Sequence, residues 1–360
     1  MVLRRRDALR GLLAAPLSPI AAAGCTSIGP TRLDRDQLDY TRVVADSSKR
    51  QTLFNLVRMR FGDAPAFVSI NQLVSGYTVQ GTAQGSLQTF PSAAPSSFWA
   101  LLFGVQYTDR PTFTLNPVSG EQFVQAYLRP FAPANVVPLI QGGVPVDVLF
   151  RLVVQSVGPL QNTHPLAGAR RSGSPDFLPV LASLRELQEG GALRVRVHRE
   201  REGARAFVAF DTTHAPGLRG LVDRVYARLG VDPAAREVEI VYGPAGDRPR
   251  GREVPVLTRS LLNVLGAVAA EIEVPEREVR EGRTRPTLRE PGAPRPMVVV
   301  RSGPSRPGES YAAVRVADRW YWVDSTDFES KAAFSILELL KSIAESTRGQ
   351  DAPVLTIPTG

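Results

Sequence analysis

The sequence is poor in the residues that most metal and redox sites require. Its 360 residues include one cysteine, Cys25, and three histidines. One cysteine excludes a disulfide framework and a thiolate zinc site, and three scattered histidines leave little for an imidazole metal centre. Beyond the N-terminus, no apolar run reaches the roughly 18 residues of a membrane-spanning helix. We therefore predict no metal, no cofactor and no spanning helix.

Common catalytic motifs are missing as well. No glycine-rich fingerprint follows a predicted strand, and the sequence contains no Gly-Lys dipeptide. A phosphate-binding loop and a dinucleotide fold are therefore not expected. No Gly-x-Ser-x-Gly elbow is present, so a serine hydrolase of that type is not expected either. These absences favour a protein that is not an enzyme.

The composition is that of a globular protein with a basic balance. Hydrophobic residues make up 43% and charged residues 22% of the chain, which predicts a packed core. A net charge of +8 raises nucleic acid as a partner. However, the arginines are scattered among almost as many acidic residues, and removal of residues 1–24 lowers the charge to +5. We expect no nucleic-acid partner.

The first 24 residues have the order of an export signal. A positive stretch, Arg4–Arg10, precedes an apolar stretch, Gly11–Ile20, and small residues then lead to Cys25. The apolar stretch is too short to span a bilayer, and Pro16 and Pro19 interrupt it. We therefore predict that residues 1–24 are a cleaved signal peptide.

The segment Ala22–Cys25 resembles the lipobox of bacterial lipoproteins, although Ala22 stands where leucine is usual. The resemblance implies cleavage between Gly24 and Cys25, a diacylglycerol thioether on Cys25 and a further acyl chain, such as palmitate, on the new amine. Two or more acyl chains hold a protein firmly to a membrane. An ordinary secretory signal with an incidental cysteine is the alternative.

Two further features concern the route and the membrane. Arg5 and Arg6 begin a segment that looks like a twin-arginine export motif, and an arginine-rich signal for the general route is the alternative. Thr26, rather than aspartate, follows the cysteine, which by resemblance to the enterobacterial sorting rule implies the outer membrane. The expected location is the cell envelope, with the protein facing the periplasm.

The rest of the chain predicts an α+β fold, with antiparallel hairpins and segregated helices in two mixed halves. The proline- and glycine-rich segment 161–175 is the predicted linker. The expected organisation is a lipidated tether at 25–36, an N-terminal α+β domain at 37–160 and a C-terminal α+β domain at 176–360.

Apolar periodicity and turn residues give the expected elements. Ser119 and Gln122 form a predicted capping box, and Gly81–Ser97 is predicted to be a mobile or weakly paired excursion. The expected helices include Asp39–Gly62, Val146–Val157, Asp176–Glu189, Leu218–Leu229, Leu261–Ala270 and Ser330–Ser346. The expected strands include Phe67–Gln80, Val105–Leu115, Leu193–Val197, Ala204–Phe210, Val238–Tyr242, Met297–Val300, Tyr311–Val316, Trp320–Val323 and Val354–Ile357.

The densest aromatic cluster marks a candidate ligand surface. Trp320 and Trp322 share one face of a predicted strand, and Asp324 and Asp327 follow them. This arrangement suits a sugar-stacking platform with a carboxylate pair. Alternatively, the tryptophans fill the space between the sheet and the helix at Ser330, with Asp327 close to the N-terminus of that helix.

Several short segments carry a resemblance that spans nearly all of the chain after the signal peptide. They are Asp39-Tyr40, Leu53–Arg60, Phe67–Tyr77, Pro117–Glu121, Ser260–Leu265, Trp320–Asp324 and Ser330-Lys331. Together they resemble a family of uncharacterised bacterial lipoproteins. The resemblance implies location and the integrity of both halves, but it implies no reaction, cofactor or catalytic residue.

These observations favour a membrane-anchored lipoprotein that acts as a non-catalytic binding or assembly module. Its expected partners are the membrane, through the N-terminal lipid, and a protein or polymer of the envelope. The alternative is a periplasmic enzyme that acts on envelope glycans or peptides through Asp324 and Asp327. The oligomeric state and the ligand stay open.

Overall fold

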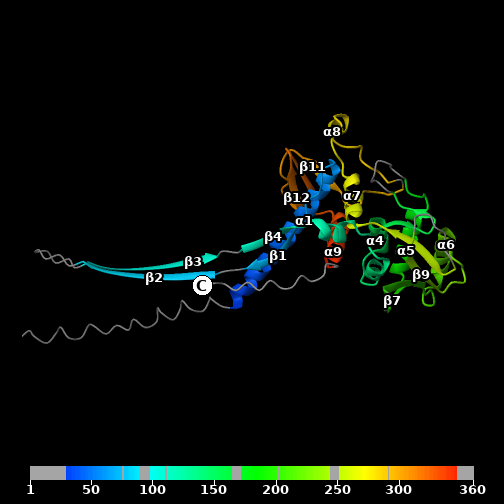
Figure 1. Cartoon of the computed structure of the whole chain (residues 1–360), viewed down its shortest axis with the longest axis horizontal. Helices are drawn as coiled ribbons and strands as arrows, with labels where there is room; N and C mark the ends of the chain where they lie inside the picture. The colour runs from blue at the N-terminus through cyan, green and yellow to red at the C-terminus, as the bar shows by residue number, and fades with distance from the viewer. Residues whose placement is uncertain are drawn as a thin grey trace, which may run out of the picture.

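The computed structural model describes most of the chain and confirms the α+β class (Figure 1). The described residues form nine α-helices, a six-stranded mixed sheet and a three-stranded antiparallel sheet. Arg5, Arg6, Gly24 and Cys25 lie outside this part of the chain, as does the predicted strand Val354–Ile357. The described ranges are 30–74, 77–88, 98–109, 112–163, 172–200, 203–243, 251–290 and 292–346.

The six-stranded sheet crosses the predicted domain boundary at 161–175. Its strand order is β6-β5-β10-β9-β8-β7, and all neighbours are antiparallel except β9 and β10. Strands β5 and β6 precede the boundary, whereas the other four follow it. The strands are β5 (Val154–Val157), β6 (Leu160–Gln161), β7 (Leu193–Glu200), β8 (Gly203–Phe210), β9 (Glu237–Tyr242) and β10 (Glu253–Thr258).

Two elements of this sheet differ from the sequence prediction. Helix α4 (Val146–Val153) stops four residues earlier than predicted, and the chain continues directly into β5. A continuous apolar run does not distinguish a buried helix from a buried strand, so periodicity alone missed this change. Strand β10 is not predicted at all, because Pro255 at its centre argues against a central strand.

The helices beside this sheet agree better with their sequence patterns. Helices α5 (Phe177–Glu189) and α6 (Arg219–Leu229) follow the predicted positions, and α5 contacts both α4 and α6. Gly230, at φ +72°, ends α6 in the left-handed conformation that glycine adopts without strain.

The three-stranded sheet packs against the longest helix. Its order is β11-β13-β12, and both pairs are antiparallel. Helix α1 (Pro30–Arg60) contacts β12 and helix α7 (Leu261–Glu271), while helix α9 (Phe328–Ser346) contacts α7, α1 and β13. The strands are β11 (Val300–Gly303), β12 (Ser310–Val316) and β13 (Arg319–Asp324).

Two predictions about helix starts are wrong. Helix α1 begins at Pro30 rather than at Asp39, so it takes in most of the predicted tether; proline is well tolerated in the first helical turn. Ser119 does occupy the N-cap of α2, but its side chain makes no capping hydrogen bond. The short helices are α2 (Gly120–Phe123), the π-helix η1 (Val124–Leu128), α3 (Pro133–Val136), η2 (Val137–Ile140), η3 (Pro216–Leu218) and α8 (Glu276–Arg280).

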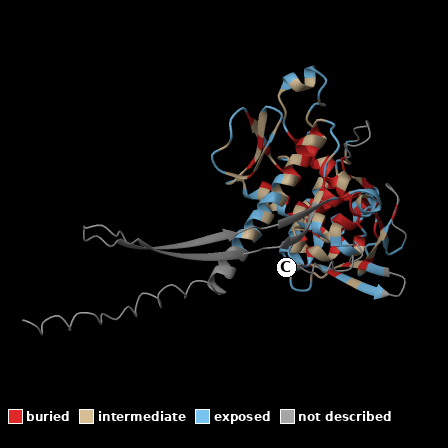
Figure 2. Ribbon diagram, turned by 60° about the vertical axis from the view of Figure 1, so that its left-hand side comes forward, coloured by how far each residue is buried: buried red, intermediate tan, exposed pale blue. Residues whose placement is uncertain are grey.

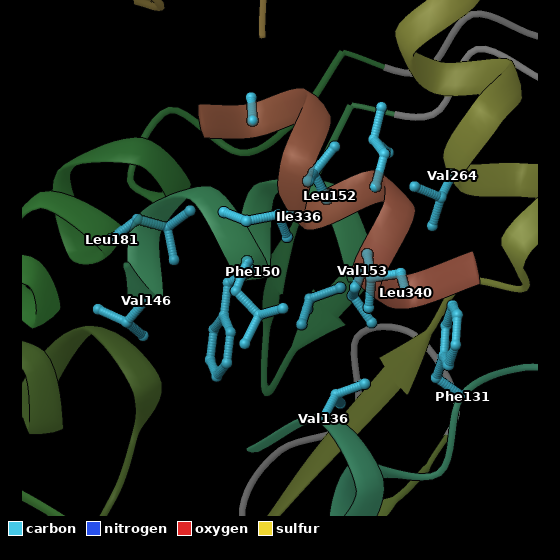
Figure 3. Packing of buried hydrophobic residues seen from close by; sticks show 14 of the residues in the cluster. Phe131, Val136, Val146, Phe150, Leu152, Val153, Leu181, Val264, Ile336 and Leu340 are labelled. Atoms are coloured by element: carbon cyan, nitrogen blue, oxygen red, sulfur yellow. The ribbon is translucent and has the colours of Figure 1, made fainter. Parts of the chain in front are cut away.

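One contiguous hydrophobic core joins both sheets and the main helices. Figure 2 shows the buried residues concentrated inside this part of the molecule. Figure 3 shows residues of this cluster, among them Leu152 and Val153 of α4 and Ile336 and Leu340 of α9. We call the described residues outside β1–β4 the body.

A long two-stranded arm extends from the body (Figure 1). Strands β1 (Val68–Val74) and β4 (Thr112–Pro117) pair at its root, and β2 (Tyr77–Gln88) and β3 (Phe98–Asp109) pair along its length. The predicted loose excursion at Gly81–Ser97 is therefore wrong for residues 81–88, and residues 89–97 lie outside the described chain. We call the β2–β3 pair the hairpin.

Candidate functional site

The structure separates the two faces of the predicted aromatic surface. On β13, Tyr321 and Val323 are 2% and 0% exposed, and the ring of Tyr321 meets that of Phe61 on the α1 side at 6.2 Å. Trp320 and Trp322 alternate with them and are half-buried on the other face of the sheet. The buried face of β13 therefore carries Tyr321 and Val323, and the tryptophans that were predicted to fill the space between sheet and helix lie on the opposite face.

Arginine side chains accompany the tryptophans on the outer face. The guanidinium carbon of Arg306 lies 5.6 Å from the ring centroid of Trp320. Arg315 is the register partner of Trp320, and Arg301 is that of Trp322. Gly303 leaves room for Trp322, since a Cβ atom there would lie 3.3 Å from the indole. This face can offer stacking area and positive charge, but Arg306 already engages one ring.

The carboxylate of Asp324 is held in a local turn. It accepts hydrogen bonds from the backbone N–H and the hydroxyl of Thr326, at 3.0 and 2.8 Å. These two bonds lower the pKa of Asp324. Arg301 adds an ion pair at 3.6 Å.

Asp327 caps helix α9. It accepts hydrogen bonds from the backbone N–H and hydroxyl of Ser330, at 3.1 and 2.7 Å, and from Arg295 at 2.5 Å. Burial opposes ionisation of Asp327, but the bonds from Arg295 and Ser330 outweigh it and lower its pKa to about 2. A glycosidase pair needs one carboxyl group with a raised pKa. The geometry therefore favours the structural interpretation of Asp327.

A network of buried charged side chains lies next to this cap, and the sequence did not predict it. Arg151 of α4 binds Glu271 at 3.0 Å and Glu290 at 2.6 Å, and all three side chains are at most 13% exposed. Glu271 also accepts a hydrogen bond from the backbone N–H of Met297 at 2.6 Å. Burial raises the pKa of Glu271, while Arg151 opposes that shift. No local motif could have revealed this network, because its members are spread over about 140 positions of sequence.

Arg259 is a second buried arginine, and it lies next to Arg151. Its guanidinium donates to the carbonyl oxygens of Arg151 and Leu152, both at 3.0 Å, and to that of Thr163. Burial lowers the pKa of Arg259 to about 10, so the group keeps its charge at neutral pH. These bonds tie α4 and the β6 end of the sheet to the start of α7. The network is a structural cross-link.

A cavity of about 650 Å³ opens beside the network. Val148, Leu178, Leu181 and Met297 supply apolar lining. Asp147, Arg151, Arg295 and Glu329 supply its charged groups. Its volume lies in the range of small-molecule pockets.

The described residues supply few groups for chemistry at this cavity. Asp147 Oδ1 is buried and has no hydrogen-bond partner among them. In the same part of the chain, no group of three or more His, Cys, Asp or Glu side chains is arranged to bind a metal ion. The described helices also include none with the length and apolar character needed to cross a bilayer. The cavity can hold an apolar group with a polar end, and nothing in it marks a reaction.

Comparison of the chain with protein-family models, curated proteins and solved structures gives no match. The resemblance to bacterial lipoproteins therefore stays a prediction.

Proposed function

We propose that the protein is a lipid-anchored lipoprotein of the outer membrane, facing the periplasm, and that it acts as a non-catalytic assembly module. The observation that carries this proposal is the hairpin. Its strands β2 and β3 pair with each other, and within the described residues neither strand pairs with a third. Within the described residues, the hairpin contributes no strand to the sheets of the body. It can therefore bind another component of the envelope.

The root of the arm is fixed to the body. Asn55 of α1 exchanges two hydrogen bonds with the backbone of Ala66, at 2.8 and 2.9 Å, and Gln51 donates to the carbonyl oxygen of Val68 at 3.1 Å. The ring of Phe67 stacks on that of Tyr127 at 3.8 Å. The body thus holds the base of the arm, as a module that presents a binding element requires.

The alternative is an enzyme that acts on envelope glycans or peptides through Asp324 and Asp327. Less supports it, because hydrogen bonds and arginine partners occupy both carboxylates and lower the pKa of each. General acid catalysis by either group would need the opposite shift.

The lipid anchor is tested by metabolic labelling with palmitate. We expect Cys25→Ser to abolish incorporation of the label, because only a thiol forms the thioether, and we expect globomycin to block processing of the unaltered protein. Ser27→Ala is the matched control, since it leaves the cysteine in place. Undiminished labelling of the Cys25→Ser protein would contradict the anchor.

A further inference from the structure

The arm differs from the rest of the chain in charge. Between Asp63 and Asp109 the sequence contains no Asp, Glu, Lys or Arg, although charged residues make up 22% of the protein. Strands β2 and β3 both lie in this interval, except that β3 ends at Asp109. A surface hairpin in water normally carries charged residues along its edges. The missing charge therefore points to surroundings other than water.

The register of the hairpin divides it into two unlike faces. Successive positions of a strand lie on opposite faces, and paired positions lie on the same face. On one face every position of β2 is Thr, Gln or Ser. On the same face, β3 contributes Thr108, Gln106 and Gly104 near the body, and Leu102, Ala100 and Phe98 toward the far end. On the other face only Asp109, at the end next to the body, is polar. That apolar face comprises Tyr77, Val79, Gly81, Ala83, Gly85 and Leu87 of β2 with Tyr107, Val105, Phe103, Leu101 and Trp99 of β3.

The dimensions of the apolar face match a bilayer. Each strand has twelve residues, and a transmembrane strand needs about 9–11. Tyr77 and Tyr107 mark one end of the face, and Trp99 marks the other. The ten steps from Tyr77 to the Trp99 pair span about 34 Å along the strand, or about 26 Å along the membrane normal at a tilt of roughly 40°. Membrane strands have an apolar band about 25 Å tall, bounded by aromatic residues.

The first described helix after the predicted anchor begins on the same side of the molecule as the hairpin. Helix α1 begins five residues after Cys25, and Figure 1 shows its N-terminal end on the side from which the hairpin projects. A lipid on Cys25 would therefore bring the hairpin, rather than the opposite end of the body, to the bilayer.

We propose that the hairpin inserts into the bilayer with its apolar face toward the hydrocarbon, and that copies of this chain place their hairpins edge to edge in a closed ring. Among the described residues, no strand pairs with the outer edge of β2 or of β3. The ring follows from this, because hydrocarbon offers backbone N–H and C=O groups no other partner. This inference rests on the proposed function, since the lipid anchor supplies the local concentration for assembly.

The test uses the processed, lipidated protein in vesicles of phosphatidylethanolamine and phosphatidylglycerol. Single cysteines carrying an environment-sensitive fluorophore replace Ala83 or Val105 on the apolar face and Gln84 or Gln106 on the other. Quenching by doxyl-labelled lipid should be several-fold stronger at the first two positions, and quenching by aqueous iodide should be stronger at the second two. Chemical cross-linking in the vesicles should give a ladder that ends at one oligomer.

A charge placed on either face gives a second readout that needs no label. We expect Val105→Arg to reduce the inserted fraction about 30-fold or more, from the cost of a charge at the bilayer midplane. Gln106→Arg, at the adjacent position on the opposite face, should have a much smaller effect. Far-UV circular dichroism checks that the body of both variants stays folded.

The outcomes separate this inference from the proposed function. The unsubstituted protein is the blank, and reaction of its Cys25 with the fluorophore would contradict the lipid anchor alone. Equal lipid quenching on both faces, or anchored protein that stays monomeric, would overturn the insertion proposal. A hairpin protected from lipid and from iodide would also overturn it, because the apolar face would then be covered by another protein.

Discussion

The body and the hairpin differ in how charged and apolar residues are distributed. In the body, Arg151, Glu271 and Glu290 are buried together in one network, and other ion pairs are exposed at the surface. The hairpin has no charged residue before Asp109, and by its register one of its two faces is apolar up to that residue. A protein in water rarely leaves a long apolar strip uncovered. Under the two proposals above, the body supplies the stability of the protein and the hairpin makes its interactions.

The sharpest way to break this comparison is to remove a large apolar side chain from each region. Phe334 of α9 is fully buried and meets the ring of Tyr311 at 5.7 Å. We expect Phe334→Ala to lower the free energy of unfolding by about 4 kcal/mol, since the site loses burial and leaves a cavity. Phe103→Ala in the hairpin should change it by less than about 0.5 kcal/mol. Urea titration followed by circular dichroism measures both, and equal losses would contradict the division of roles.

A smaller effect is expected from the buried charges of the body. Arg151→Met keeps the apolar stem but removes the ion-pair partner of Glu271 and Glu290. We expect a loss of about 2–3 kcal/mol in the free energy of unfolding. This is somewhat less than for a fully buried ion pair, because water in the neighbouring cavity can solvate the remaining carboxylates.

The matched control for Arg151→Met is Arg277→Met. The side chain of Arg277 is 72% exposed, and its partner Glu281 is the C-cap residue of α8. Such exposed pairs contribute little, so its expected effect is close to zero. A similar loss in both variants would show that burial of the network does not matter.

The smallest effect concerns Asp327 and depends on pH. Its folded pKa of about 2 lies below the ordinary value of 3.8. Its contribution to the free energy of unfolding is therefore present above about pH 4 and is lost as the pH falls toward 2. Because Arg295 is partly exposed, we expect about 1 kcal/mol rather than the full value of the shift. Asp327→Asn should lower stability at pH 7 and reduce the loss of stability between pH 4 and pH 2. Asp318→Asn, at a fully exposed position, should do neither.

This last measurement also addresses the alternative function. A catalytic Asp327 without a capping role would lose activity on substitution and leave the unfolding curve unchanged. Thermal unfolding between pH 2 and pH 7 distinguishes the two results.

Local patterns were informative where an element has one clear face. The period of α5 and α6 and the alternation of β7 and β8 predicted these elements close to their observed bounds. The position of Asp327 at the N-terminus of the last helix was also predictable from sequence. Patterns failed where both faces of an element are buried, as in α4 and β5, and where polar alternation in β2 resembled a loop.

The sequence by itself determined the α+β class, most of the helices and the alternation along the strands, because each depends on the spacing of neighbouring residues. Only the tertiary structure decided that Tyr321 rather than Trp322 faces the core, that Arg151 meets Glu271 and Glu290, and that one sheet joins β5 to β10. These features depend on contacts between residues that lie far apart in the sequence, and no local spacing specifies which distant surface covers a given face.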